Sequence, residues 1–128
     1  MKPNQTIKAL RLALCAFLLA FGLPALAVEQ GVEAPEFDVA GQTVNVKLSS
    51  YHGKLVYLDF WASWCGPCKK SFPWMNDMQK RYGAQGFQVV PVNLDAKRTD
   101  ALEFLSIVPV GLAVGFDPAG GVARSYGV

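Results

Sequence analysis

The sequence predicts a single α/β domain in which a β-hairpin precedes a parallel βαβ core along the chain. Two observations point to this fold class. Apolar runs rich in β-forming residues, such as 54–61 and 87–94, alternate with segments whose apolar residues recur with the period of a helix. These runs also carry almost no charge, as expected of parallel strands that are covered on both faces. At 128 residues the chain has room for one domain.

The segment 1–27 is predicted to be a targeting segment rather than part of the folded domain. Residues 1–11 contain three cations and no acid, the uncharged apolar run 12–23 follows, and Ala-Leu-Ala ends the segment at Ala27. This order is that of a secretory signal cleaved after Ala27. The alternative is an uncleaved membrane anchor, since the uncharged stretch just reaches the length that spans a bilayer.

Residues 28–32 are then expected to form a linker to a domain over 33–128. Export would place the domain's cysteines where disulfides persist. The chain has 12 Lys and Arg against 10 Asp and Glu, and without the three early cations the balance is 9 − 10 = −1. This balance argues against a nucleic-acid partner, which needs a basic face on the folded domain. A content of 52% hydrophobic and 17% charged residues excludes a disordered chain.

The domain is expected to begin with two short strands and a turn. The strands 37–39 and 43–48 are separated by Ala-Gly-Gln at 40–42, which is a hairpin signal. Residues 49–53 form a turn that contains His52, the only histidine. The run 54–61 follows as a central strand buried on both faces.

A helix is predicted from the Cys-Gly-Pro-Cys segment to about Tyr82, since its apolar residues recur every three or four positions. Pro73 should kink this helix because it removes a backbone donor, and Gly83 and Gly86 should end it.

The rest of the domain is predicted to continue the alternation of strands and helices. Residues 87–94 are the next buried strand, and 99–107 a short helix with Thr99 as its N-cap. A further strand over 112–116 is closed by a turn at 117–121.

The sharpest chemical signal is Trp-Cys-Gly-Pro-Cys at 64–68, after a buried strand and at the start of a helix. The backbone N–H groups and the dipole at a helix N-terminus favour a thiolate at Cys65. Cys68, one turn further along, is placed to close a disulfide with it. The pair could attack a substrate disulfide through Cys65 and resolve the mixed disulfide through Cys68. Pro67 would fix the first turn, and Trp64 would offer an apolar face.

Two other readings of the cysteine pair remain open. A zinc site needs about four ligands, whereas the exported domain offers one Cys-x-x-Cys and His52. A purely structural disulfide would stabilise the fold weakly, since a two-residue loop restricts the unfolded chain little.

Asp59 is the second candidate site residue. An acid in the middle of an apolar strand is costly to bury unless it is paired or protonated. Strand alternation places it on the face opposite Leu58 and Phe60. We hypothesise that Asp59 lies beneath the cysteines with a raised pKa and accepts the proton of Cys68. A carboxylate that reaches solvent or pairs with a lysine is the alternative.

The stretch 58–69, together with Pro73, closely resembles thioredoxin. Further segments resemble the exported TlpA/ResA-type branch of that family, namely 34–37, 41–48, 53–54, 89–95, 117–118 and 125–128. The resemblance covers about residues 33–128. It implies a thioredoxin-like fold and thiol–disulfide oxidoreductase activity, with Asp59 as the buried acid.

The resemblance also implies roles and partners. Cys65 would attack and Cys68 would resolve, with Trp64, Gly66 and Pro67 in the substrate groove. The substrates would be protein thiols and disulfides, such as apocytochrome or copper-site cysteines kept reduced in the periplasm by a membrane electron donor. No organic cofactor or metal is expected.

The sequence departs from the family at three places. Ser71 stands where many relatives have an acid, and Val92 where thioredoxin has a lysine near its buried acid. The chain also ends before the cis-proline loop, the last strands and the last helix of the family, so we expect a C-terminally incomplete domain. Peroxiredoxin-like peroxidase activity and a non-catalytic interaction domain are the alternative functions.

Overall fold

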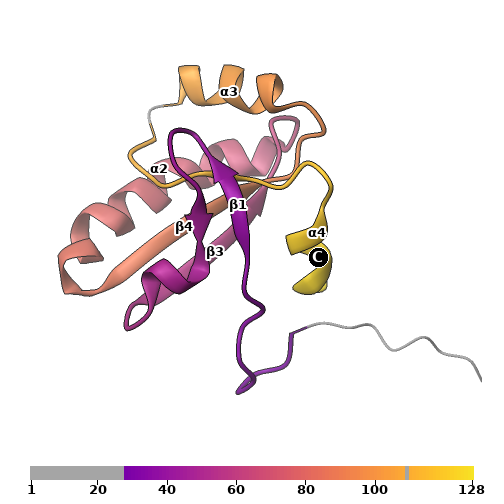
Figure 1. Cartoon of the computed structure of the whole chain (residues 1–128). Helices are drawn as coiled ribbons and strands as arrows, with labels where there is room; N and C mark the ends of the chain where they lie inside the picture. Colours follow the sequence, from indigo (N-terminus) through magenta and orange to yellow (C-terminus); the bar gives the residue numbers. More distant parts are fainter. Residues whose placement is uncertain (1–27, 109) are drawn as a thin grey trace, which may run out of the picture.

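The computed structural model describes residues 28–108 and 110–128 of the chain (Figure 1). The predicted signal or anchor segment lies outside these residues. The helices and strands, in chain order, are β1 (Asp38–Gly41), β2 (Val46–Lys47), the 3-10 turn η1 (Leu48–Tyr51), β3 (Leu55–Trp61), α2 (Gly66–Tyr82), the 3-10 turn η2 (Gly83–Gln85), β4 (Phe87–Asn93), α3 (Arg98–Ile107), β5 (Gly115–Phe116) and α4 (Gly121–Ser125).

The five strands form one sheet in the order β2-β1-β5-β4-β3. β4 is parallel to β3 and to β5, whereas β1 is antiparallel to β2 and β5. The predicted α/β class is therefore confirmed. The strands β3 and β4 with the helix α2 form a parallel βαβ core, and the β1–β2 hairpin joins this core through β5. The close approach at this junction suits a glycine, since a Cβ on Gly115 would lie 2.7 Å from Cγ2 of Val39.

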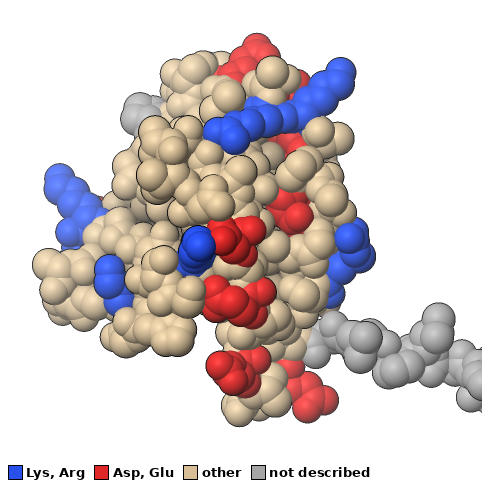
Figure 2. Space-filling view, in the orientation of Figure 1, with Lys and Arg blue, Asp and Glu red and all other residues tan. Residues whose placement is uncertain are grey.

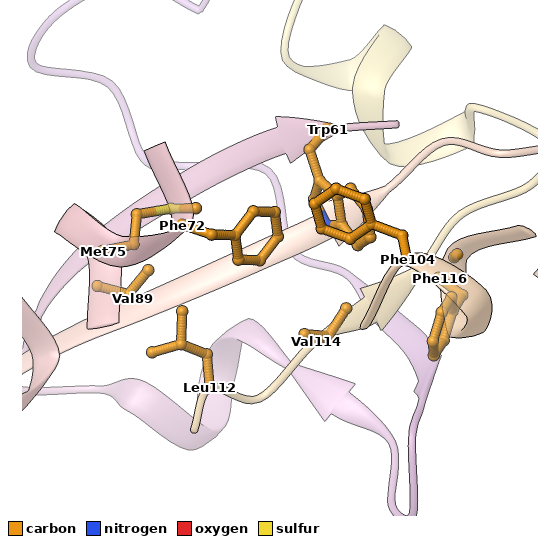
Figure 3. Close-up of a cluster of buried hydrophobic side chains, with 9 residues drawn as sticks. Trp61, Phe72, Met75, Val89, Phe104, Leu112, Val114 and Phe116 are labelled. Atoms are coloured by element: carbon orange, nitrogen blue, oxygen red, sulfur yellow. The ribbon is translucent and has the colours of Figure 1, made fainter. Parts of the chain in front are cut away.

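Apolar side chains fill both faces of the sheet. On one face α2 and α3 bury a cluster made of Trp61, Phe72, Met75, Val89, Ala101, Phe104, Leu112, Val114 and Phe116. Figure 3 shows these side chains meeting between the two helices and the strands. On the other face α4 and the hairpin cover a cluster of Phe37, Val46, Val90, Val92 and Val122. The first cluster supports the start of α2, where the cysteines lie.

Asp117 organises the C-terminal part of the described chain. Its Oδ1 accepts from the backbone N of Gly121 at 2.9 Å, and its Oδ2 accepts from those of Val122 at 2.8 Å and Ala123 at 3.2 Å. A carboxylate satisfies the free N–H groups of a helix N-terminus. The predicted turn at 117–121 therefore continues into a helix that the sequence analysis did not predict.

Several predicted boundaries and roles are corrected by the structure. The first hairpin strand begins at Asp38 and continues to Gly41, two residues beyond the prediction, and the second is shorter than predicted, with only Val46 and Lys47. Among the described residues β3 pairs with β4 alone and forms an edge of the sheet, whereas a central strand was predicted. The N-cap of α3 is Lys97, without a side-chain cap; the Thr99 hydroxyl donates instead to Oδ1 of Asp100. Leu112 and Val114 pack in the core, but 112–114 has no strand pairing, which leaves β5 with two residues.

The helix after the cysteines is close to the prediction. α2 runs from Gly66 to Tyr82 and continues through Pro73. It passes into η2, and Gly86 then takes the left-handed conformation, with φ 87°, that glycine adopts readily. No helix within 28–108 and 110–128 is long and apolar enough to cross a membrane.

Candidate active site

The two cysteines lie at the junction of β3 and α2. The chain leaves β3 at Trp61 and makes a turn in which the N–H of Cys65 donates to the carbonyl of Ala62 at 3.0 Å. Cys65 is the N-cap of α2, in extended conformation, and its Sγ accepts from the N–H of Cys68 at 3.3 Å. The two residues form a disulfide with their Cα atoms 5.3 Å apart. The structure thus brings together the predicted thiol pair at the predicted helix end.

The surroundings of the two sulfurs differ. Cys68 packs against the apolar cluster under α2. Around Cys65, Trp64 is 82% exposed, and Gly66 and Pro67 are exposed as well. A Cβ placed on Gly66 would meet no atom within 4 Å, so the space above the first turn is open. The motif therefore presents an apolar surface to solvent on one side and rests on the core on the other.

Asp59 lies on the face of β3 that α2 covers. Its neighbours two residues away on that face both contact α2: the ring of Tyr57 is 5.4 Å from that of Trp74, and the ring of Trp61 is 4.9 Å from that of Phe72. Leu58 and Phe60 pack on the opposite face, as predicted.

The carboxyl group of Asp59 has an unusual environment. Its Oδ2 is buried without a hydrogen-bond partner among the described residues. Burial raises the pKa of Asp59 above its ordinary value of 3.8. A carboxyl group of this kind is suited to hold and exchange a proton.

The residue beside Asp59 on the next strand is Pro91, not Val92. The register pairs Asp59 with Pro91, while Val92 packs on the opposite face with Phe60. The expectation that Val92 stands in the place of a lysine near the acid was therefore wrong. Asp59 instead has an apolar, non-donating neighbour, which leaves its carboxyl group without a cation on that strand.

Asp95 is a further polar residue at this site, and the sequence analysis did not single it out. Its side chain is 4% exposed. Its carboxylate accepts from the N of Ser63 at 3.0 and 3.2 Å, from Oγ of Ser63 at 3.1 Å and from Nδ2 of Asn93 at 2.8 Å. Asp95 thereby fixes the turn that leads into Cys65. The available signal was its place just after a buried strand, because the carboxyl ends of parallel strands share one edge of the sheet.

His52 lies apart from the cysteines, whereas Lys69 and Lys70 follow Cys68 directly on α2. His52 lines a hollow of about 290 Å³ with Glu33, Glu36 and Lys54, formed by the N-terminal segment and η1. Lys69 Nζ lies 5.8 Å from the ring centroid of Phe104, and Lys70 is exposed. Within the described ranges, no group of three or more His, Cys, Asp or Glu could hold a metal ion.

The profile of the AhpC/TSA family matches residues 30–128. The thiol-disulfide oxidoreductase ResA of Bacillus subtilis (strain 168) is 35% identical over 104 residues, which cover 79% of this chain and 57% of ResA. ResA of Bacillus thuringiensis subsp. konkukian is 32% identical over 104 residues, covering 79% of this chain and 59% of ResA. The chain thus spans less than two thirds of the length of these relatives.

Solved structures are similar over most of the chain. A putative thiol:disulfide interchange protein DsbE from Chlorobium tepidum is 59% identical with a TM-score of 0.78, and the match covers 80% of this chain and 72% of that one. A putative protein disulfide isomerase from Bacteroides thetaiotaomicron is 31% identical with a TM-score of 0.70, over 77% of this chain and 64% of that one.

Proposed function

The chain belongs to the AhpC/TSA family and has a thioredoxin-like fold, and on that premise we propose that its Cys65–Cys68 pair exchanges thiols and disulfides with protein substrates. The observation that carries this proposal is the position of Cys65. It caps α2 with its Sγ toward the backbone N–H of Cys68, where the reduced form would be stabilised as a thiolate.

The reaction follows from the unequal surroundings of the two sulfurs. The Cys65 thiolate attacks one sulfur of a substrate disulfide; a new S–S bond forms and the other substrate sulfur leaves as a thiolate. Cys68 then attacks Sγ of Cys65, which closes the Cys65–Cys68 disulfide and releases the second substrate sulfur. Two electrons pass from the dithiol to the substrate, and a separate reductant restores the dithiol.

Asp59 is proposed to accept the proton that Cys68 loses when it attacks. Its place on the face under α2, its unpartnered Oδ2 and its raised pKa support this role. Trp64, Gly66 and Pro67 are proposed to contact the substrate, since they form the exposed surface around Cys65.

The direction and the location are finer parts of the proposal. We propose that the protein works as a reductant in the periplasm, on cytochrome or metal-site thiols, with electrons from a membrane donor. The residues 28–128 would follow a secretory signal or anchor. The similarity to ResA and DsbE proteins supports this assignment, and the direction depends on the reduction potential of the pair.

The first test is a redox titration of the chain in glutathione buffers, in a Cys15→Ser background so that only one thiol pair reports. Alkylation and intact mass give the fraction of disulfide. The reference is a reduction potential of about −200 mV, which glutathione buffers can set. A reduction potential of the Cys65–Cys68 pair well below this value supports a reductant. A reduction potential above it supports an oxidase or isomerase.

Turnover of a protein disulfide with dithiothreitol tests the activity itself. Cys65→Ser should abolish it, and Cys68→Ser should accumulate the mixed disulfide on Cys65. Peroxide consumption without disulfide turnover would favour the peroxidase alternative instead. A chain that folds but supports neither reaction would favour a structural disulfide.

The role of Asp59 is tested by the rate of mixed-disulfide resolution. Asp59→Asn should slow resolution by about 100-fold or more near neutral pH, because a positioned base contributes about 10²- to 10⁴-fold. The rate of the first attack by Cys65 should change much less. Equal resolution rates in both proteins at every pH from about 6 to 9 would refute the role.

A further inference from the structure

A hollow of about 420 Å³ lies beside the cysteine motif, between the turn before Cys65 and the helix α3. Its lining residues are Ser63, Trp64, Lys69, Asp100, Glu103, Phe104 and Ile107. Since Trp64 directly precedes Cys65 in the chain, a ligand in this hollow would contact the residue beside the attacking cysteine. The hollow is therefore placed to contact the residues that flank a substrate disulfide.

The walls of the hollow are held firmly from behind. Ser63 is fixed through its backbone N and its Oγ by the buried carboxylate of Asp95. Phe104 is 6% exposed, and its ring lies 4.9 Å from that of Trp61 and 5.3 Å from that of Phe72. The hollow thus exists before a ligand arrives, which reduces the entropic cost of binding.

The rim of the hollow is apolar and open to solvent. Trp64 is 82% exposed and Ile107 is 76% exposed, among the highest values of the large apolar side chains. Such a pair beside a reactive group is characteristic of a surface that binds a partner. It offers a place for an aliphatic or aromatic side chain of the substrate.

The charges at the hollow are unbalanced. Asp100 and Glu103 are one turn apart on α3, and neither forms an ion pair with a basic group in the described ranges. Lys69 is the one cation of the lining, against two carboxylates. Arg98 is engaged elsewhere, because its guanidinium donates to the carbonyl of Gly41 at 2.6 Å and lies 4.3 Å from the ring centroid of Phe116.

We propose that this hollow selects substrates, and that its occupant is an extended segment of a protein substrate in which a cationic and an apolar side chain flank the cysteine. The cation would meet Asp100 and Glu103, and the apolar side chain would pack between Trp64 and Ile107. This inference rests on the proposed thiol–disulfide exchange and names the substrate class for it.

The first test measures binding without any redox step. The oxidised chain is titrated with two short peptides in which serine replaces cysteine, flanked by Arg and Leu in one and by Glu and Leu in the other. Amide chemical shifts of Trp64 and of residues 100–107 should move with the Arg peptide, which should bind about three- to tenfold more tightly. Equal binding of both peptides, or shifts that spare α3, would overturn the inference even in a chain with no exchange activity.

The second test measures the rate at which Cys65 attacks small disulfides in a Cys15→Ser background. Cystamine is cationic and dithiodiglycolate is anionic, and the ratio of their rates reports the local charge. Asp100→Asn with Glu103→Gln should lower this ratio about three- to tenfold at low salt, since each exposed pair contributes modestly.

The matched control neutralises two other carboxylates, Glu29→Gln with Glu33→Gln. Figure 2 shows acidic side chains gathered where the N-terminal described segment lies, and Figure 1 places that segment at the end of the molecule opposite α3. The control changes net charge equally and should shift the ratio less than about twofold. An equal shift in both double variants would attribute the preference to net charge and overturn the inference. No reaction with either disulfide would instead contradict the proposed function.

A third variant addresses the apolar part of the hollow. Ile107→Ser should weaken binding of the Arg-Leu peptide by about threefold or more, since it removes apolar contact area. An unchanged peptide affinity would remove Ile107 from the proposed surface.

Discussion

Asp59 lies in β3 and Asp95 follows the end of the neighbouring parallel strand β4, yet their carboxyl groups have opposite environments. Asp95 is 4% exposed and accepts hydrogen bonds from Ser63 and Asn93. Asp59 has a buried oxygen with no partner in the described part of the chain. One carboxylate is satisfied by neutral donors and the other is not.

The different environments of these two carboxyl groups suit them to different roles. A carboxylate that accepts from several N–H and O–H donors holds the chain around it in place. A carboxyl group that is buried without donors has a raised pKa and gains from binding a proton. Asp95 therefore fixes the geometry of the turn before Cys65, whereas proton transfer is the role that we propose for Asp59.

The largest expected effect is the loss of stability in Asp95→Ala. This change leaves the donors of Ser63 and Asn93 without partners and should lower the free energy of unfolding by about 3 kcal/mol. Urea unfolding followed by circular dichroism measures it. The exposed Asp38→Ala is the control and should lose far less. Comparable losses in the two variants would mean that the Asp95 bonds do not hold the turn.

The second-largest effect is expected for Asp117→Ala, which should lower the free energy of unfolding by about 2 kcal/mol. Three backbone N–H groups at the start of α4 lose their acceptor in this variant. The conservative Asp117→Asn retains one acceptor oxygen and should recover part of the loss. Hydrogen exchange of the Val122 and Ala123 amides should speed up in the alanine variant. Unchanged exchange there would indicate that α4 does not depend on Asp117.

Asp59→Asn should raise the free energy of unfolding instead of lowering it, by an amount that depends on pH. Since the folded protein binds the Asp59 proton more tightly than the unfolded chain does, the contribution of Asp59 to stability is greatest below the ordinary pKa of 3.8 and is lost as pH rises through the raised pKa. The variant lacks this loss. It should be more stable than the wild type at pH 7 by on the order of 1 kcal/mol, because its side chain leaves no buried charge.

The measurement for Asp59 is a series of urea unfolding curves from about pH 4 to pH 8. The gain in the asparagine variant should shrink toward zero at the acid end. A difference that stays constant over the whole range would show that it does not come from the ionisation of Asp59.

Thr99→Ala should have the smallest effect, within about 0.5 kcal/mol, because Thr99 does not cap α3 and its hydroxyl bonds only to the exposed Asp100. Thermal unfolding measures it. A loss near 1 kcal/mol would restore the capping role that the sequence predicted.

The strands and the helix around the cysteines could be predicted closely from the sequence. β3, α2 and β4 have strong apolar patterns, and their observed bounds differ from the prediction by about one residue. The positions of Cys65 and Cys68 follow from the motif at the helix start. The face occupied by Asp59 follows from the alternation of side chains along a strand.

The less regular parts could not be predicted in the same way. Residues 112–114 have the composition of a strand, but only Gly115 and Phe116 find partners on β4 and β1. Propensity does not specify which residues pair across the sheet. α4 was missed because Gly120 and Gly121 resemble a turn, and the helix depends on the capping carboxylate of Asp117.

The hydroxyl of Tyr126 donates to the carbonyl of Pro35 at 2.7 Å and so connects residues 91 positions apart. β1 likewise needs β5 as its neighbour. During synthesis from the N-terminus, the hairpin therefore has no place to dock until the segment around Tyr126 has left the ribosome. Contacts between such distant residues slow folding. The cysteines emerge well before that point, so the start of α2 is synthesised before the hairpin can dock.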